Sequence, residues 1–276
     1  MFARAQLTMK SAFFALALAA LLPGLSSAQT AEREVDVELV LAVDVSRSMG
    51  AEEMEIQRRG YAAALTDPQV LDAIFSGLTG RVAITFMEWA GDGNQHVVVP
   101  WREIATPQDA QAFADLLLSG PSFNMRYTSI SGAILTAVRL FDGNGFKGLK
   151  RVIDISGDGP NNQGVPVDEA RDLAVANGII INGLPLMTTT GTYGRYSIPD
   201  LDRYYIDCVI GGPASFSVPV TSWETFPEAV RRKLVLELAG GVPGANQLPV
   251  HRTAGEASTD CLIGERLLWQ WDFNVR

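Results

Sequence analysis

The sequence predicts an α/β fold: a doubly wound, mostly parallel central sheet with helices on both faces. Apolar, β-branched runs of strand length alternate along the chain with stretches whose apolar residues recur at helical spacing. Most of these strands are separated by a whole helix, which is the connection that parallel strands need. The 276 residues are 47% hydrophobic and 19% charged, so the chain can bury a large core and is not intrinsically disordered.

The first 28 residues have the pattern of a secretory signal peptide. Arg4 and Lys10 precede an apolar run, and small residues lead up to Ala28. The apolar run is about half the ~20 residues that a membrane-spanning helix needs. We therefore expect cleavage after Ala28, whether translation begins at Met1 or at Met9, and an exported protein, periplasmic or secreted, with no membrane span.

The first strand and the first helix are predicted by two different patterns. Residues 35–43 are an apolar, β-branched run, which is typical of a buried strand. Residues 51–65 follow with helical spacing, because Met54, Tyr61 and Leu65 share one face between charged positions.

Cap and turn residues mark the next elements. Asp67 and Pro68 are typical of a helix start, and they open a short helix that ends near residue 75. Residues 81–89 and 96–101 are predicted strands. The Gly-Asp-Gly-Asn sequence between them favours a hairpin.

The chain then continues the alternation of amphipathic stretches and β-branched runs as far as residue 238. The predicted helices cover residues 106–118, 129–141, 168–176 and 223–238, and the predicted strands cover residues 150–156, 179–186 and 216–220.

The tail has a different period. Trp269, Trp271, Phe273 and Val275 alternate with polar residues, so we expect a final strand with one apolar face. The predicted organisation is a signal peptide over residues 1–28, one domain over residues 29–239, and a C-terminal strand extension over residues 240–276 packed on that domain.

The strongest chemical signal is Asp44-x-Ser46-x-Ser48, where the first strand ends and a helix begins. One carboxylate and two hydroxyls on a tight loop are hard oxygen ligands that suit magnesium, manganese or calcium. Thr128 opens a later helix and Asp158 follows a later strand, and in a doubly wound sheet both reach the edge where Asp44 lies. The alternative is that the loop residues cap a helix.

These three segments, in this order, resemble the metal-ion-dependent adhesion site of the von Willebrand factor A domain. In that family a D-x-S-x-S loop, a threonine and an aspartate hold one divalent ion. Asp44, Ser46 and Ser48 match the first segment, Thr128 the second and Asp158 the third. The resemblance covers most of the chain after the signal peptide. It implies one bound divalent cation, with Mg²⁺ in first place and Mn²⁺ or Ca²⁺ as alternatives.

More narrowly, the chain is similar to an uncharacterised family of secreted bacterial proteins, domain of unknown function 1194. The stretches that match are residues 88–91, 156–159 and 208–213, together with the predicted helix 222–238. That family's name assigns no function, so this similarity sharpens the expected fold and not the role.

The resemblance to the A domain implies binding rather than catalysis, since the ion in such sites keeps an open position that an acidic group of a partner fills. We therefore expect an exported, non-enzymatic protein that recognises an acidic residue of a protein partner through a divalent cation. Two alternatives remain open. One is an envelope-assembly component in which the ion only stabilises loops, and the other is a hydrolase that uses the ion to activate water.

Two further sets of residues are weaker candidates. Asp154 shares strand parity with Asp158, so it is a candidate to orient the ion ligands, and a buried carboxylate bonded to backbone amides is the alternative. Tyr193, Arg195 and Tyr196 are candidates for partner contact, because Tyr and Arg are enriched in interface hot spots. A solvated loop is the alternative for these three residues.

The chain has two cysteines, Cys208 and Cys261. Export places both in an oxidising compartment, so we expect them to pair and to tie the tail to the domain. The alternative is two buried free thiols.

Composition and spacing also argue against several classes of protein. The net charge of -9 argues against nonspecific nucleic-acid binding, which needs an excess of cations. Two histidines leave little room for a histidine-rich zinc site. Gly143-x-Gly145-x-x-Gly148 follows a predicted helix and precedes a strand, the reverse of the context that a dinucleotide-binding fingerprint requires.

Overall fold

Five strands form one sheet in the computed structural model, which describes residues 32–120, 124–188, 197–239 and 259–274. The strands are β1 (Arg33–Asp44), β2 (Val82–Trp89), β3 (Gln95–Ile104), β4 (Phe146–Gly157) and β5 (Ile179–Pro185). Their order across the sheet is β3-β2-β1-β4-β5, so β1 lies at the centre. β1 pairs in parallel with both β2 and β4, β4 pairs in parallel with β5, and only β3 is antiparallel, to β2. The predicted mostly parallel sheet, with its β2–β3 hairpin, is confirmed. The predicted signal peptide lies outside the described residues.

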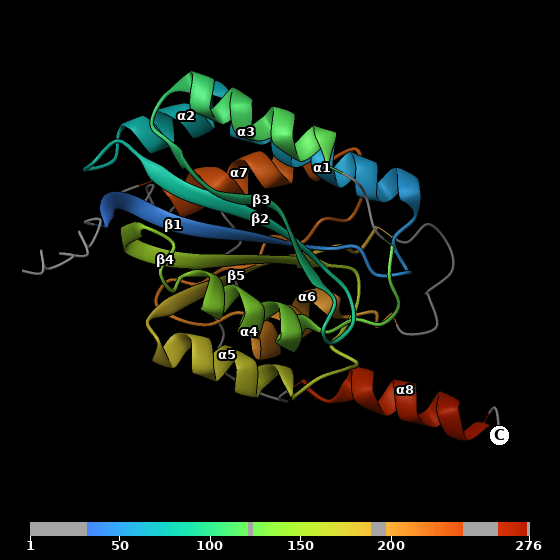
Figure 1. Ribbon diagram of the computed structural model, residues 1–276. Coiled ribbons are helices and arrows are strands. Elements are labelled where there is room, and N and C mark those ends of the chain that lie inside the picture. Colours follow the sequence, from blue (N-terminus) through green and yellow to red (C-terminus); the bar gives the residue numbers. More distant parts are fainter. Residues whose placement is uncertain (1–31, 121–123, 189–196, 240–258, 275–276) are drawn as a thin grey trace, which may run out of the picture. The chain divides into compact units, whose positions relative to one another are not determined.

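Helices cover both faces of this sheet, as the doubly wound prediction requires (Figure 1). On one face lie α1 (Ala51–Leu65), α2 (Pro68–Phe75), α3 (Pro107–Ser119) and α7 (Phe226–Leu238). On the other face lie α4 (Ile130–Leu140), α5 (Val167–Ala176), α6 (Leu201–Tyr204) and a π-helical turn over Tyr205–Val209. α6 and the π-helical turn were not predicted from the sequence.

β1 is buried on both faces, and this explains its continuous apolar run. Leu39 and Leu41 belong to the core beneath α1 and α7, whereas Val40 and Ala42 belong to the core beneath α4 and α5. A strand at the centre of such a sheet has no solvated face, so it needs no polar alternation. The carboxyl end of β1 is thereby held at the middle of the sheet edge.

Caps place the helix starts where the sequence predicted them. The carboxylate of Asp67 accepts a hydrogen bond from the Gln69 amide (2.8 Å) at the start of α2, with Pro68 in the first turn. The Ser129 hydroxyl accepts one from the Gly132 amide (3.1 Å) at the start of α4. Each side-chain cap satisfies an amide that the helix itself leaves free.

The strand predicted over residues 216–220 does not form. Pairing with the edge of β5 is limited to isolated bridges at Ser217 and Val220. Pro185 ends β5 and has no amide hydrogen to donate to the neighbouring segment. A continuous ladder is therefore interrupted between the two bridges.

The predicted C-terminal strand is wrong, because Ile263–Asn274 form helix α8. Asp260 starts the helix: its carboxylate accepts a hydrogen bond from the Leu262 amide (3.1 Å) and its carbonyl accepts one from the Ile263 amide (3.0 Å). Helix-forming residues follow over 265–268 and extend it. Trp269 is 67% exposed, so this aromatic residue does not lie on a buried face. No helix in the described ranges is long and apolar enough to cross a membrane.

Candidate metal centre

The loop that follows β1 carries Asp44, Ser46 and Ser48. The Ser46 amide donates a hydrogen bond to Oδ1 of Asp44 (2.6 Å), which turns the chain tightly at the end of the strand. The hydroxyl oxygens of Ser46 and Ser48 lie 3.0 Å apart. The N-cap of α1 is Gly50, whose amide donates to the carboxylate of Glu53. Capping of α1 therefore does not account for the three loop residues.

Asp158 lies at the same edge, because it directly follows β4, the parallel neighbour of β1. The Ser48 hydroxyl donates a hydrogen bond to Oδ1 of Asp158 (2.8 Å), which joins residues 110 positions apart in the chain. The strand order changes direction between β1 and β4, and ligands of open α/β sheets bind at the carboxyl ends of strands beside such a point. The structure thus brings Asp44, Ser46, Ser48 and Asp158 into one cluster of oxygen atoms, which we call the oxygen cluster.

Backbone hydrogen bonds hold Thr128 at this edge. Its amide donates to Oδ1 of Asn162 (2.9 Å), and its carbonyl accepts from the Asn162 amide (2.8 Å). The Met125 amide donates to the Val45 carbonyl (3.3 Å), so this segment runs beside the loop that follows β1. Tyr127 has φ = 67°, a left-handed conformation that bulky residues rarely adopt. Tyr127 lies immediately before Thr128, whose side chain is buried.

Asp44 is the most confined group of the oxygen cluster. Its side chain is fully buried, and its Oδ2 atom has no hydrogen-bond partner in the part of the chain that the structure describes. A Cβ atom on Gly157 would lie 3.0 Å from that oxygen, so glycine leaves this space open. Burial raises the pKa of Asp44 well above its usual range, and the charge of Asp158 raises it further. Burial likewise raises the pKa of the partly exposed Asp158 to about 6.

The residues present fit a divalent cation. An unpaired buried carboxylate costs free energy, and two carboxylates that face each other repel. A cation bound between Asp44 and Asp158 would remove both costs and would give Oδ2 of Asp44 a partner. Carboxylate and hydroxyl oxygens are hard ligands, the kind that Mg²⁺, Mn²⁺ and Ca²⁺ prefer. The described residues contain no cluster of three or more His, Cys, Asp or Glu side chains placed to hold a metal, so hydroxyl groups must complete this set.

One supporting side chain was not predicted from the sequence. From α1, Nε2 of Gln57 donates a hydrogen bond to the Asp44 carbonyl (3.1 Å) and ties the helix to the loop. Gln57 is fully buried and lies one helical turn from both Met54 and Tyr61 on the apolar face of α1. A polar residue on an apolar helix face needs a hydrogen-bond partner, and this signal could have identified it.

The cation-free protein should become less stable as the pH rises from about 4 to about 6. The folded protein keeps the Asp158 proton up to a pKa of about 6, whereas the unfolded chain releases it near the ordinary value of 3.8. Folding is therefore favoured at low pH, and this contribution is lost as the pH passes the folded pKa. A cation competes with the same proton, so the increase in melting temperature caused by excess Mg²⁺ should grow between about pH 5 and pH 7.

Thermal unfolding in Mg²⁺ and in EDTA at each pH measures this effect. Burial also raises the pKa of Glu237, to about 7, but that group alters both unfolding curves alike, so their difference isolates the oxygen cluster. Asp158→Asn should reduce the pH dependence of the difference, and the part that remains belongs to Asp44, whose pKa is also raised by burial. An equal Mg²⁺ effect at pH 5 and pH 7 would contradict the expected proton competition.

Asp154 does not contact the oxygen cluster. β4 ends at Gly157, so the strand alternation does not extend to Asp158, and Asp154 faces α7. Its Oδ1 atom lies 2.6 Å from Nζ of Lys233, which also bonds the carboxylate of Glu237. Neither predicted role, orienting ion ligands or accepting backbone amides, matches this contact. Asp154, Lys233 and Glu237 are all buried, and we call them the ionic triad.

Cys208 and Cys261 form a disulfide, as predicted from export, with 5.5 Å between their Cα atoms. The bond ties the start of α8 to the π-helical turn. On α8, the Glu265 carboxylate accepts a hydrogen bond from Nδ2 of Asn161 (2.6 Å). Oδ1 of Asn161 in turn accepts one from the Ser131 amide (3.0 Å). α8 thus rests on the segment that follows Asp158.

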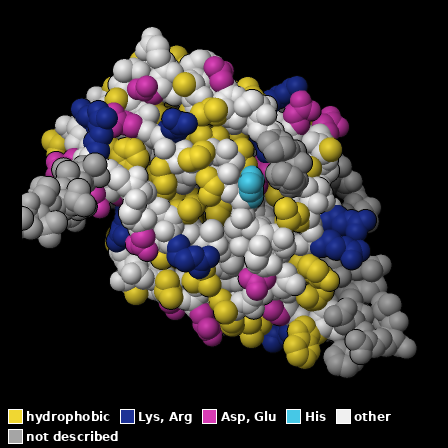
Figure 2. Space-filling view, viewed as in Figure 1, with side chains coloured by type: hydrophobic (Ala, Val, Ile, Leu, Met, Phe, Trp, Pro, Cys, Tyr) yellow, Lys and Arg dark blue, Asp and Glu magenta, His cyan; other side chains and the backbone are white. Residues whose placement is uncertain are grey.

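Two expectations about partner contact are not tested by the described residues. Tyr193, Arg195 and Tyr196 lie outside the described residues, so their role stays a prediction. The side of the molecule drawn in Figure 2 shows acidic and basic side chains interspersed, and its described residues form no broad basic patch. The expectation that the protein does not bind nucleic acid nonspecifically also stays a prediction.

Comparisons with known proteins agree with the fold. A family model described as "Protein of unknown function (DUF1194)" matches residues 34–242. No curated protein is detectably similar to the sequence. Several solved structures share the fold at low sequence identity. Proximal thread matrix protein 1 from the mussel byssus is 14% identical with a TM-score of 0.55, and the alignment covers 76% of this chain and 49% of that chain.

Two bacterial structures are similar to the same degree. The pilus adhesin SpaC from Lactobacillus rhamnosus GG is 14% identical with a TM-score of 0.53, over 75% of this chain and 32% of that chain. A von Willebrand factor type A protein from Catenulispora acidiphila is 15% identical with a TM-score of 0.52, over 74% of this chain and 43% of that chain. One structure of the mussel protein is described as having a zinc-occupied MIDAS motif, where MIDAS stands for metal-ion-dependent adhesion site. This chain spans about half or less of each of these proteins, and the likeness shows the von Willebrand A-type fold.

Proposed function

The chain belongs to the family described as protein of unknown function (DUF1194), and we propose that its domain binds a protein partner through a divalent cation. In this proposal Asp44, Ser46, Ser48, Thr128 and Asp158 hold one ion, Mg²⁺ in first place. An acidic residue of the partner completes the coordination of the ion. The role is recognition rather than catalysis.

One observation carries the proposal: the buried Oδ2 atom of Asp44, which has no hydrogen-bond partner among the described residues, lies in a cluster that contains Asp158 and two serine hydroxyls. Such a group is costly unless something pairs with it, and a cation is the partner that also relieves the repulsion from Asp158. Serine and threonine hydroxyls bring no charge. The ion would therefore keep positive charge with which to attract a carboxylate of a partner.

Two further observations support the proposal. Among proteins with the same fold, one is described as a pilus adhesin and another as having a zinc-occupied MIDAS motif. Export is supported by the leader pattern of residues 1–28 and by the Cys208–Cys261 disulfide, since such bonds persist in oxidising compartments. We propose the periplasm or the cell exterior as the location.

Mg²⁺ binding should depend on Asp44 and Asp158. Asp44→Ala and Asp158→Asn should each weaken Mg²⁺ binding by more than about 100-fold, since loss of an outer-shell group alone costs about 10–100-fold. Isothermal titration calorimetry on the full chain measures the affinity. The matched control is Asp142→Asn, an exposed aspartate in the turn before β4, at the opposite end of the strands. It should bind Mg²⁺ like the wild type.

An Asp44→Ala protein that binds Mg²⁺ as tightly as the wild type would show that the ion site is wrongly assigned. Chelation separates recognition from a role in which the ion only stabilises loops. Both roles predict a lower melting temperature in EDTA, but only recognition predicts that the Mg²⁺ form binds simple carboxylates and the EDTA form does not.

A further inference from the structure

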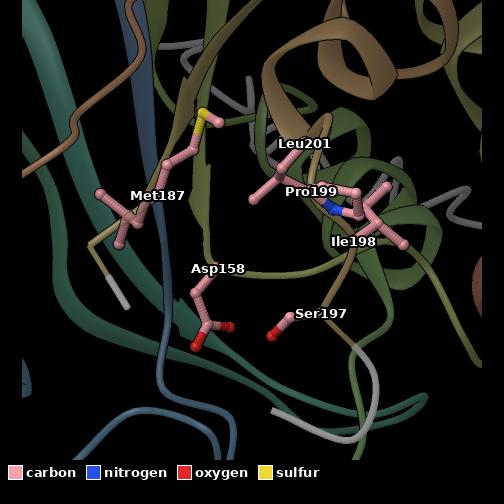
Figure 3. Close-up of a pocket in the computed structure, with 7 residues that line it drawn as sticks. Asp158, Met187, Ser197, Ile198, Pro199 and Leu201 are labelled. Carbon is pink, nitrogen blue, oxygen red and sulfur yellow. The ribbon is translucent and has the colours of Figure 1, made fainter. Parts of the chain in front are cut away.

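A pocket opens directly beside Asp158. Its lining includes Asp158, Leu186, Met187, Ser197, Ile198 and Leu201, and we call it the Asp158 pocket. Figure 3 shows the Asp158 carboxylate and the Ser197 hydroxyl at one end, with the apolar side chains of Met187, Ile198 and Leu201 around the rest. The pocket therefore has a polar end at the oxygen cluster and an apolar body beyond it.

A backbone hydrogen bond joins one apolar wall of the Asp158 pocket to the strand end that carries Asp158. The Leu186 amide donates a hydrogen bond to the carbonyl of Gly157 (2.9 Å), the residue immediately before Asp158. Leu186 and Leu201 are almost fully buried. Met187 and Ile198 are partly buried and pack against the core beneath α4 and α5. The sheet thus sets the position of Leu186 relative to the Asp158 carboxylate.

The size of the pocket suits one aliphatic side chain. Its cavity volume is about 130 Å³. An apolar cavity of about 150 Å³ is large enough to bind benzene, so this space holds a branched aliphatic group but not a second large residue.

We propose that the Asp158 pocket receives an aliphatic side chain that adjoins the acidic residue of the partner, so that the recognised element is a carboxylate with a branched hydrocarbon group beside it. This inference rests on the proposed function, since the ion is what draws the carboxylate to this edge. The pocket shares Asp158 with the oxygen cluster, so a carboxylate bound to the ion there places its neighbouring atoms at the pocket mouth. Burial of those atoms against Met187 and Ile198 adds affinity that the ion alone does not provide.

The charge of the lining favours this occupant over others. Asp158 is the one charged residue among the described residues of the lining. Without an ion it would repel a partner's carboxylate and attract an amine, whereas with a divalent cation the preference reverses. A lysine or arginine of the partner is therefore the competing occupant, and it would bind best when the ion is removed.

Small carboxylates of increasing size test the proposal. The probes are acetate, 3-methylbutanoate and 4-methylpentanoate, added to the full chain loaded with Mn²⁺, and the readout is the Mn²⁺-dependent broadening of the probe's proton signals. Each buried methylene contributes about fourfold in affinity, so the branched acids should bind at least tenfold more tightly than acetate. Equal affinities for all three would overturn the pocket inference while leaving the proposed function intact. No Mn²⁺ binding at all would overturn both.

Substitutions in the pocket walls locate the effect. Ile198→Ser and Met187→Ala should each reduce the preference for 4-methylpentanoate over acetate by about fourfold or more. Leu149→Ser, at an exposed leucine early in β4, is the control and should keep the full preference. Mn²⁺ affinity is measured in the same samples. If both wall variants lost Mn²⁺ binding, or if n-butylamine bound more tightly than the acids to the Mn²⁺ form, the pocket would not be a separate aliphatic subsite.

Discussion

Replacing Lys233 with methionine is expected to lower the free energy of unfolding by about 3–5 kcal/mol. Lys233 is fully buried, and its ammonium group is the counter-charge for the carboxylates of both Asp154 and Glu237 in the ionic triad. Without it, the folded protein must keep two buried carboxylates with no cation or must protonate them, and both cost stability. Chemical denaturation at neutral pH measures the loss.

Arg232→Met is the matched control, because Arg232 is the preceding residue of α7 and is exposed. It should change stability by no more than about 0.5 kcal/mol. A combined variant, Asp154→Asn, Lys233→Met and Glu237→Gln, should recover much of the loss, since it leaves no unpaired charge. If Lys233→Met were no less stable than Arg232→Met, the ionic triad would not carry the energy assigned to it.

The pH dependence of this loss has a definite sign. Burial and, to a lesser extent, the charge of Asp154 raise the pKa of Glu237, Lys233 opposes both effects, and the resulting pKa is about 7. Removal of the lysine raises the pKa values of both carboxylates further. The variant should therefore be least stable above pH 7, and its deficit should shrink as the pH falls and the carboxylates become protonated.

Loss of the Cys208–Cys261 disulfide is expected to lower stability by about 4 kcal/mol. The two cysteines are 53 positions apart, and closing a loop of that length restricts the unfolded chain by about this amount in the chain-entropy model. The double variant Cys208→Ser/Cys261→Ser should therefore unfold at a markedly lower denaturant concentration than the oxidised wild type.

Reductant provides the control for this comparison. Dithiothreitol should bring the wild type to the stability of the double serine variant and should leave that variant unchanged. Thiol counting on the denatured, unreduced wild type gives an independent check. Two reactive thiols would contradict the disulfide.

Local patterns made most of the fold and the outline of the oxygen cluster predictable. The buried run of β1, the cap at Asp67 and the D-x-S-x-S loop each depend on residues that are close in sequence. The order of the remaining ligands then followed from the rule that parallel strands end at one edge. The oxygen atoms of Ser48 and Asp158 do lie side by side in the structure.

The features that sequence reasoning missed depend on partners distant in the chain. Nothing near Asp154 indicates that Lys233, on α7, lies against it, so its strand parity suggested the wrong neighbour. The alternation of tryptophans in the tail has the period of a strand, but Asp260 starts a helix before that pattern begins. Pro185 lacks an amide hydrogen that a sixth strand would have needed.

The 110 positions between Ser48 and Asp158 also have a kinetic meaning. Contacts between distant segments form after local ones, because the entropy of closing a long loop is lost before the contact stabilises the chain. The hairpin of β2 and β3 and the early helices involve near neighbours in sequence, whereas the oxygen cluster needs β4 to pair with β1 across all of them. We therefore expect the oxygen cluster to assemble late in folding, after the hairpin and the early helices.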